Sequence, residues 1–175
     1  RQTPERVTLP DLSAAVRSVQ EQLRSQYRLL NAKGENPAVE SVERGTAYGE
    51  LGKFLMAAGY FDAAESSLLN AQALASSEYR WPYYLGHLRR NKGGLLKSAA
   101  SFERSLRLYP VDPAALFWLG DDQLELGRLS AAEVSFKRML EIQSDSVAAL
   151  YGLGRVAHER RDYRAAIDFF ERALW

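Results

Sequence analysis

The chain lacks cysteine and is poor in histidine, which excludes several kinds of chemistry together. None of its 175 residues is a cysteine, and two are histidines. Disulfides, thiolate catalysis, iron–sulfur clusters and cysteine-based zinc sites therefore cannot form. Two histidines also leave almost no basis for a histidine-rich metal site. We expect no metal and no other cofactor.

The chain also lacks a large net charge and long apolar runs. The 23 Lys and Arg residues against 22 Asp and Glu residues leave a formal charge of +1. Such a chain has no charge reserve for general phosphate binding, which argues against nucleic acid and against a polybasic membrane contact. Its apolar runs are far shorter than the roughly 20 residues that span a bilayer. We expect neither nucleic-acid binding nor membrane insertion.

Catalytic motifs are absent too. Gly93-Gly94 is not followed by the Lys-Ser/Thr of a phosphate-binding loop. There is no HExxH, no GxSxG and no Cys–His pair. The adjacent Asp121 and Asp122 point about 100° apart on a helix, so they do not converge on one ion. The sequence predicts a protein that is not an enzyme.

A period of 34 residues runs through most of the chain. The dipeptide Leu-Gly recurs without insertion at 51–52, 85–86, 119–120 and 153–154. Another column holds Gly59, Gly93, Gly127 and Arg161. A column of bulky apolar residues holds Leu68, Phe102, Phe136 and Phe170. Repetition at this length is typical of solenoids, whose stacked units share one continuous core.

One unit is readable as a pair of helices. Apolar residues recur at three- and four-residue spacing over residues 83–92 and 96–108, which indicates two amphipathic helices. Residues 91–94, Asn-Lys-Gly-Gly, break the pattern and supply left-handed backbone for a turn. Small residues in the Leu-Gly column allow the two helices to approach closely, and we expect the bulky column to fill the space between units.

These columns resemble the tetratricopeptide repeat (TPR), a family in which helical hairpins stack. The resemblance implies an all-α, right-handed α-solenoid of four TPR helical hairpins with an N-terminal capping helix, in a protein of bacterial type. The expected segments are 1–44, the lead-in and capping helix; 45–78, TPR 1; 79–112, TPR 2; 113–146, TPR 3; and 147–175, a shortened TPR 4.

The capping helix is predicted from the residues before the first unit. Asp11 or Ser13 can cap a helix with one apolar stripe. The stripe comprises Leu12, Val16, Val19, Leu23, Tyr27 and Leu30. We expect residues 33–35 to form a turn, and the next helix to run from Pro37 to Ala57. A dimerisation or partner helix is the alternative reading of this segment.

The first helices of the units should line a groove, as the family resemblance implies. Their inward stripe mixes aromatic rings with charged side chains, the residue types enriched in protein interfaces. The candidate peptide-binding residues are Lys53, Arg80, Tyr83, Tyr84, His87, Arg90, Asn91, Phe117, Trp118, Asp121, Glu125, Tyr151, Arg155 and His158. Gly49 shares the stripe in the first unit, and the charged members are expected to have no partner on their own helix.

Two other readings of this stripe stay open. The aromatic residues Tyr83, Phe117 and Tyr151 could simply pack between units. The carboxylate clamp known in the family needs Lys and Asn four residues apart, whereas Gly49 and Lys53 stand there, so a chaperone-tail ligand is not favoured.

The sequence therefore favours a non-catalytic protein–protein interaction module that binds a protein or peptide ligand in the concave groove. The alternative is a scaffold or regulatory arm of a longer protein whose activity lies beyond residue 175. A further hypothesis is self-association through an exposed C-terminal helix that carries Phe169, Phe170, Leu174 and Trp175. The first residue, Arg1, and the polar lead-in favour an exported, periplasmic chain over a cytoplasmic one.

Overall fold

The computed structural model describes residue 5, residues 7–36 and residues 38–174 of the chain, without the side chain of Glu35. Every regular element among these residues is an α-helix, which confirms the all-α prediction for the part described. The chain divides into two compact units, Arg1–Lys92 and Gly93–Trp175. Across the described residues, no helix combines the length and the apolar character needed to cross a membrane.

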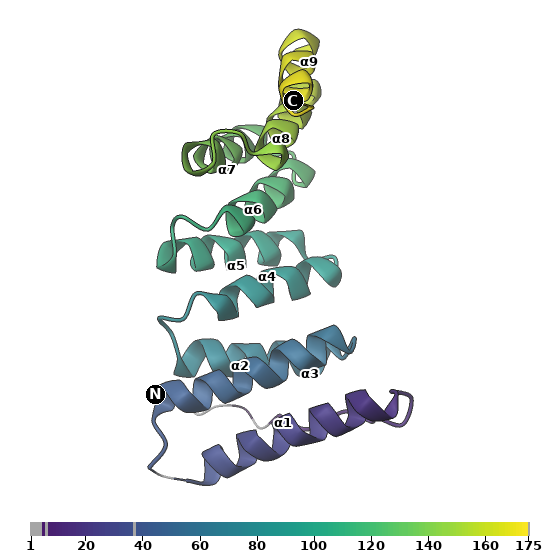
Figure 1. Ribbon diagram of the computed structural model, residues 1–175, viewed down its shortest axis with the longest axis vertical. Coiled ribbons are helices and arrows are strands. Elements are labelled where there is room, and N and C mark those ends of the chain that lie inside the picture. The colour runs from purple at the N-terminus through teal and green to yellow at the C-terminus, as the bar shows by residue number, and fades with distance from the viewer. Residues whose placement is uncertain (1–4, 6, 37, 175) are drawn as a thin grey trace. The chain divides into compact units, whose positions relative to one another are not determined.

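The first unit holds four helices and an extended lead-in. They are α1 (Arg17–Glu35), α2 (Ser41–Ala57), α3 (Phe61–Leu74) and α4 (Arg80–Asn91). α2 and α3 form a tightly packed hairpin, with α1 against α2 and α4 against α3 (Figure 1). One apolar core joins all four helices and includes Leu23, Leu55 and Trp81.

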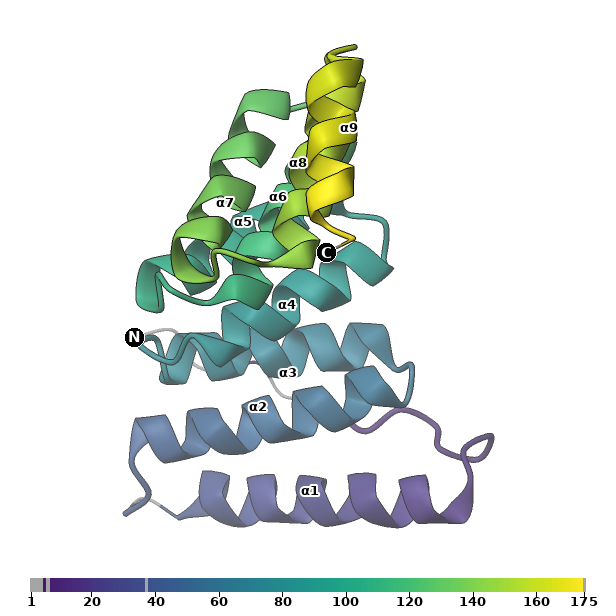
Figure 2. The same cartoon turned by 45° about the horizontal axis from the view of Figure 1, so that its top comes forward.

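The second unit holds five helices. They are α5 (Leu95–Leu108), α6 (Pro113–Glu125), α7 (Leu129–Ile142), α8 (Val147–Glu159) and α9 (Tyr163–Arg172). α6 and α7 pair as one hairpin and α8 and α9 as the next, and both α6 and α7 also contact α8 (Figure 2). Because α4 and α5 belong to different units, the count of four hairpins and the right-handed sense of the solenoid stay predictions.

The repeated glycine column lets the two helices of a hairpin touch. A methyl group added at Gly52 would lie 2.7 Å from Cγ of Leu68. At Gly120 it would lie 2.8 Å from the ring of Phe136. Contacts this short leave no room for a side chain, so the glycine and the bulky residue sixteen positions later form one packing unit. The predicted close approach of the two helices is confirmed, but Leu68 and Phe136 make these contacts within their own hairpin. A contact between hairpins is made by Phe136, whose ring also lies where a side chain at Gly152 would stand.

The start of the capping helix differs from the prediction. α1 begins at Arg17, after Val16, and neither Asp11 nor Ser13 caps it. The Asp11 carboxylate accepts hydrogen bonds from the backbone N–H and the hydroxyl of Ser13, both at 2.9 Å. These two bonds lower the pKa of Asp11. The polar groups expected to cap the helix are satisfied within a local turn, so Leu12 reaches the core from outside the helix.

The turn expected at residues 33–35 is helical instead. α1 continues to Glu35, and Lys33 forms an ion pair with Glu43 of α2. The turn lies beyond it, where the Asn36 side chain accepts a hydrogen bond from the N–H of Ala38 at 3.0 Å. α2 then begins at Ser41 rather than at Pro37, which lies outside the described residues. Gly34 was read as a turn former, but a single glycine is tolerated inside a helix.

The column of interhelix turns has one strained member. Gly59, Gly93 and Gly127 have φ values of 82°, 76° and 71°, and Arg161 in the same column has φ 63°. A side chain costs energy in this left-handed region, whereas glycine does not. We expect Arg161→Gly to raise the free energy of unfolding by about 1 kcal/mol. Urea denaturation checks this, and an unchanged or lower midpoint would contradict it.

A cationic side chain joins two acidic residues in the first unit. Lys92 Nζ lies 2.8 Å from both Asp62 Oδ1 and Glu65 Oε2, and Arg89 Nε lies 3.2 Å from Glu65 Oε1. Burial raises the pKa of Glu65, but the hydrogen bonds from Lys92 and Arg89 outweigh it, so the pKa falls below its ordinary value of 4.5.

This lowered pKa predicts acid sensitivity. A folded-state pKa below the unfolded value gives stability that is present above pH 4.5 and is lost as the pH falls through the folded value. We expect the urea midpoint to fall as the pH is lowered from 6 toward 3, and Glu65→Gln to remove part of that fall. Denaturation curves at several pH values test this. Parallel curves for the two proteins would contradict it.

Candidate functional site

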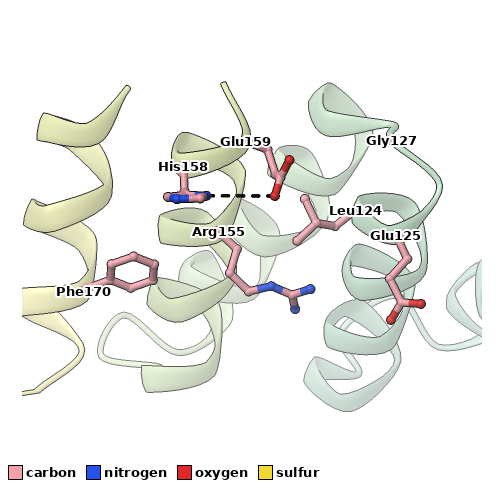
Figure 3. A pocket seen from close by; sticks show the side chains of 7 residues that line it. All are labelled: Leu124, Glu125, Gly127, Arg155, His158, Glu159 and Phe170. Atoms are coloured by element: carbon pink, nitrogen blue, oxygen red, sulfur yellow. Dashed lines mark ion pairs between the residues drawn. The ribbon is translucent and has the colours of Figure 1, made fainter. Parts of the chain in front are cut away.

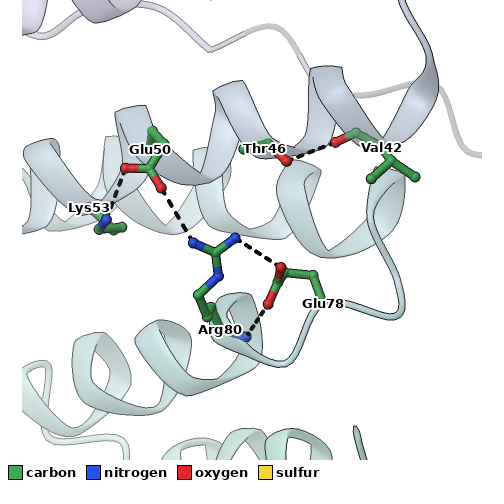
Figure 4. Close-up of polar contacts among 6 residues, drawn as sticks. All are labelled: Val42, Thr46, Glu50, Lys53, Glu78 and Arg80. Carbon is green, nitrogen blue, oxygen red and sulfur yellow. Dashed lines mark hydrogen bonds and ion pairs between the residues drawn. The ribbon is translucent and has the colours of Figure 1, made fainter.

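In the first unit, two cationic candidates, Lys53 and Arg80, converge on Glu50. Lys53 Nζ lies 2.9 Å from Glu50 Oε2 on α2, and Arg80 Nη1 lies 3.9 Å from Glu50 Oε1 (Figure 4). Arg80 also donates a hydrogen bond of 2.9 Å to Glu78. The hydrogen bond with Glu78 and the neighbouring charges raise the pKa of Arg80 above its ordinary value. The expectation of charges without a partner on the same helix is therefore wrong for Lys53.

Aromatic rings on α4 lie beside these charges. The Tyr83 ring meets the His87 ring edge to face at a centroid distance of 4.6 Å, and the Tyr84 ring at 5.7 Å. Lys53 Nζ lies 5.5 Å from the centroid of Tyr84. All three rings are half-buried, and so is Arg90, whereas Asn91 at the helix end is exposed. The structure thus brings five candidates together on one mixed surface: Lys53, Arg80, Tyr83, Tyr84 and His87.

Gly49 does not belong to that surface. It is buried, and a methyl group added to it would lie 2.3 Å from Cζ3 of Trp81. The ring of Trp81 is fully buried and occupies the space where a side chain at position 49 would stand. Gly49 is therefore a packing residue, and the prediction that it lines the groove is wrong.

In the second unit, two charged candidates pair across neighbouring repeats. Arg155 of α8 donates a short hydrogen bond to Asp121 of α6, which lies one 34-residue period earlier in the chain. Asp121 is only 7% exposed, whereas the Arg155 side chain keeps a third of its surface in solvent. The pair fixes the guanidinium in place and leaves part of it open to a ligand.

Arg155 lines a polar pocket. Its volume is about 650 Å³, and its lining comprises Leu124, Glu125, Gly127, Arg155, His158, Glu159 and Phe170 (Figure 3). His158 Nδ1 lies 4.0 Å from Glu159 Oε1, and both side chains are more than half exposed. Three predicted site residues, Glu125, Arg155 and His158, thus meet in one cavity that offers groups of both charges.

Two aromatic candidates of the same unit, Phe117 and Tyr151, line an apolar groove. Its volume is about 660 Å³, and it is lined by Phe117, Val147, Ala148, Tyr151, Phe170, Ala173 and Leu174. Tyr151 is 52% exposed, and its ring centroid lies 5.7 Å from that of Phe170. The Phe117 ring centroid lies 5.3 Å from that of Trp118 and 6.2 Å from that of Phe136. Phe117 therefore packs partly against the core and partly lines the groove.

Sequence reasoning missed two residues of these surfaces. Glu50 links Lys53 to Arg80, and its position three residues before Lys53 on a helix is the signal that could have found it. Phe170 lines both the polar pocket and the apolar groove, although its column predicts only core packing. Trp118 and Asp121, by contrast, are candidates that line neither cavity.

No metal centre emerges among the described residues. They contain no group of three or more His, Cys, Asp or Glu side chains placed to hold one ion. Asp121, the acidic candidate next to Asp122, is engaged by Arg155. The mixed surface of the first unit, the polar pocket and the apolar groove offer groups suited to binding, namely aromatic rings, the guanidinium groups of Arg80 and Arg155, and carboxylates.

Comparison with solved structures places the fold among known solenoids. The crystal structure of MamA matches at 19% identity with a TM-score of 0.79, over 95% of each chain. A tetratricopeptide repeat protein from Parabacteroides merdae ATCC 43184 matches at 19% identity and a TM-score of 0.80, over 89% of this chain and 59% of that one. YrrB, described as a TPR protein with an unusual peptide-binding site, matches at 18% identity and a TM-score of 0.73, over 90% and 80%.

The family itself follows from the sequence. No curated protein matches this chain. The tetratricopeptide repeat model matches residues 83–146 and, in a second alignment, residues 120–174, which together cover more than half of the chain. Those segments contain the Leu-Gly dipeptides at 85–86, 119–120 and 153–154 that set the 34-residue period. The chain is a member of the tetratricopeptide repeat family.

Proposed function

We propose that this protein is a non-catalytic interaction module that binds an extended peptide or partner segment along the first helices of its repeats. Stacked hairpins of this family generally serve as binding surfaces for other proteins. The observation that carries the proposal is the arrangement around α8. There the apolar groove and the polar pocket adjoin, with the Phe170 ring lining both.

The arrangement favours a ligand with two kinds of side chain. Tyr151 in the apolar groove and Arg155 in the polar pocket stand four residues apart on α8, about 6 Å along the helix. An extended peptide advances about 6.6 Å over two residues. A bulky apolar side chain at one ligand position and a polar or charged one two positions later would fit the two cavities together.

The mixed surface of the first unit is the second part of the proposal. Tyr83, Tyr84 and His87 offer ring faces, and Arg80 and Lys53 offer cations that Glu50 holds in place. Rings provide contact area at a low cost in conformational entropy, and held cations recognise carboxylates.

A peptide library tests this function. We expect ligands selected on the wild-type chain to bind at least about tenfold more weakly to Tyr151→Ser and to His158→Ala, the loss typical of an interface anchor. Tyr109→Ser is the matched control, because Tyr109 is 42% exposed and lines neither cavity. Undiminished binding to both variants of the α8 surface would overturn the proposal.

A second copy of the chain is the competing occupant of the apolar groove. Leu174 is 82% exposed and Phe169 and Phe170 are half-buried, whereas Trp175 lies outside the described residues. Self-association through these side chains would hide the groove from a peptide. Sedimentation at two protein concentrations separates the two cases. A monomer at both keeps the groove available, and a dimer weakened by Tyr151→Ser would assign it to a second copy.

A further inference from the structure

The lead-in before α1 is held against the first unit as an extended peptide would be. Residue 5 and residues 7–12 form no helix, yet Val7 and Leu12 are each only 5% exposed. Both belong to the same apolar core as Leu23 and Leu30 of α1. In Figures 1 and 2 the described part of this segment runs beside α1.

One buried amide side chain recognises the main chain of the segment. The Asn70 Oδ1 accepts a hydrogen bond from the Glu5 N–H at 3.0 Å, and its Nδ2 donates one of 2.7 Å to the Glu5 carbonyl. Asn70 is only 6% exposed. The Tyr27 hydroxyl donates a third bond, of 3.2 Å, to the Val7 carbonyl. All three bonds go to backbone atoms, so they would form with any extended chain in this place.

Asn70 is an exception within its repeat column. The equivalent positions one, two and three periods later are Arg104, Arg138 and Arg172. The amide is therefore not a requirement of the hairpin framework. An unpaired amide this deeply buried would be costly, which ties Asn70 to a main-chain partner.

The side chains of the segment supply the apolar contribution. Val7 is buried, Thr8 is exposed and Leu9 is half-buried, which is the alternation of an extended chain lying on a surface. Leu12 is the second buried anchor, five residues after Val7. Because five is an odd spacing, the two anchors would face opposite sides of a regular strand, so the chain bends between them to bury both. Main-chain bonds together with buried apolar anchors form a recognisable mode of peptide binding.

We propose that Tyr27 of α1, Asn70 of α3 and the surrounding core form a second peptide site. Its ligand is a non-helical segment with apolar side chains five positions apart, and residue 5 and residues 7–12 occupy it as a resident, exchangeable ligand. The site is separate from the surfaces on α4, α6 and α8, so either proposal can fail without the other. A tethered segment acts at an effective concentration on the order of millimolar, so a free peptide competes poorly until the resident segment is weakened.

The first experiment uses the full chain with its resident segment weakened. Val7→Asp places a charge in the core position and leaves Tyr27 and Asn70 in place. A fluorescent peptide with the sequence of residues 1–14 should bind this variant at least about tenfold more tightly than it binds the wild-type chain. The same peptide carrying Val7→Asp is the matched control and should not bind. Adding Asn70→Leu to the variant should abolish binding.

A folded Val7→Asp chain that binds no peptide would overturn the proposal. If that variant fails to fold, a second measurement on the intact sequence decides. Because the chain has no cysteine, Thr8→Cys offers a single position for a spin label on an exposed residue of the segment. Unlabelled peptide at about 10 mM, above the effective concentration of the tethered segment, should increase the mobility of the label, and an unchanged spectrum would contradict exchange. A dimer in the same sample would assign the site to a second copy and contradict a site for free peptides.

Discussion

Replacing Gly49 by alanine is expected to lower the free energy of unfolding by about 2–3 kcal/mol, although alanine favours a helix over glycine by up to about 1 kcal/mol. The added methyl group would lie 2.3–2.5 Å from three ring carbons of Trp81. That ring is fully buried and rigid, so α2 and α4 would have to move apart. Urea denaturation measures the loss.

A double-mutant cycle isolates the cause. Trp81→Leu removes the ring, so Gly49→Ala in that background should cost at least about 1 kcal/mol less than in the wild type. Gly34→Ala is the matched control on α1, because nothing lies within 4 Å of a methyl group added there. It should be neutral or stabilising. Equal effects of the Gly49 and Gly34 substitutions would show that the contact with Trp81 is not the determinant.

Gly152→Ala is expected to destabilise the second unit by about 2 kcal/mol or more, whereas Gly154→Ala should cost less than about 1 kcal/mol. Both methyl groups would meet a ring, Gly152 that of Phe136 at 2.5 Å and Gly154 that of Phe170 at 2.4 Å. The distances predict similar effects, so the difference must come from how freely each ring can move.

The two rings differ in their surroundings. Phe136 is fully buried, and a methyl group added at Gly120 of α6 would also lie 2.8 Å from this ring. Phe170 is half-buried and lines two open cavities, so its ring can turn outward. Thermal or urea denaturation of the two variants tests this account. A larger loss at Gly154 than at Gly152 would contradict it.

Most of the fold could be predicted because the same packing requirement selects the same kind of residue at each equivalent position of the repeat. The glycine and bulky columns are constrained in the same way in each unit, so Gly52 with Leu68 and Gly120 with Phe136 predict the close approach that the structure contains. The lead-in before α1 lies outside the repeats, so it has no equivalent positions with which it could be compared. Asp11 and Ser13 satisfy each other in a turn, and Asn70 holds Glu5, contacts across 65 residues that no local pattern signals.

The residue types of the candidate site could be predicted from the sequence, but not which of its side chains contact one another. The stripe of aromatic and charged residues follows from helical spacing, and Glu125, Arg155 and His158 do line one pocket. The pair between Asp121 and Arg155 depends on how two helices stack, which a single helix pattern does not contain. The prediction that Gly49 lines the groove is wrong for the same reason. The Trp81 ring that covers it comes from another helix.

The central claim is that α8 and its neighbours form the binding surface, and amide chemical-shift mapping tests it most directly. A labelled chain would be titrated with the tightest peptide selected from the library. We predict the largest shifts at Tyr151, Arg155 and His158 and on α9 around Phe170, with Tyr109 unaffected. Shifts confined to α3, α7 or the turns between hairpins, with α8 unchanged, would contradict the account.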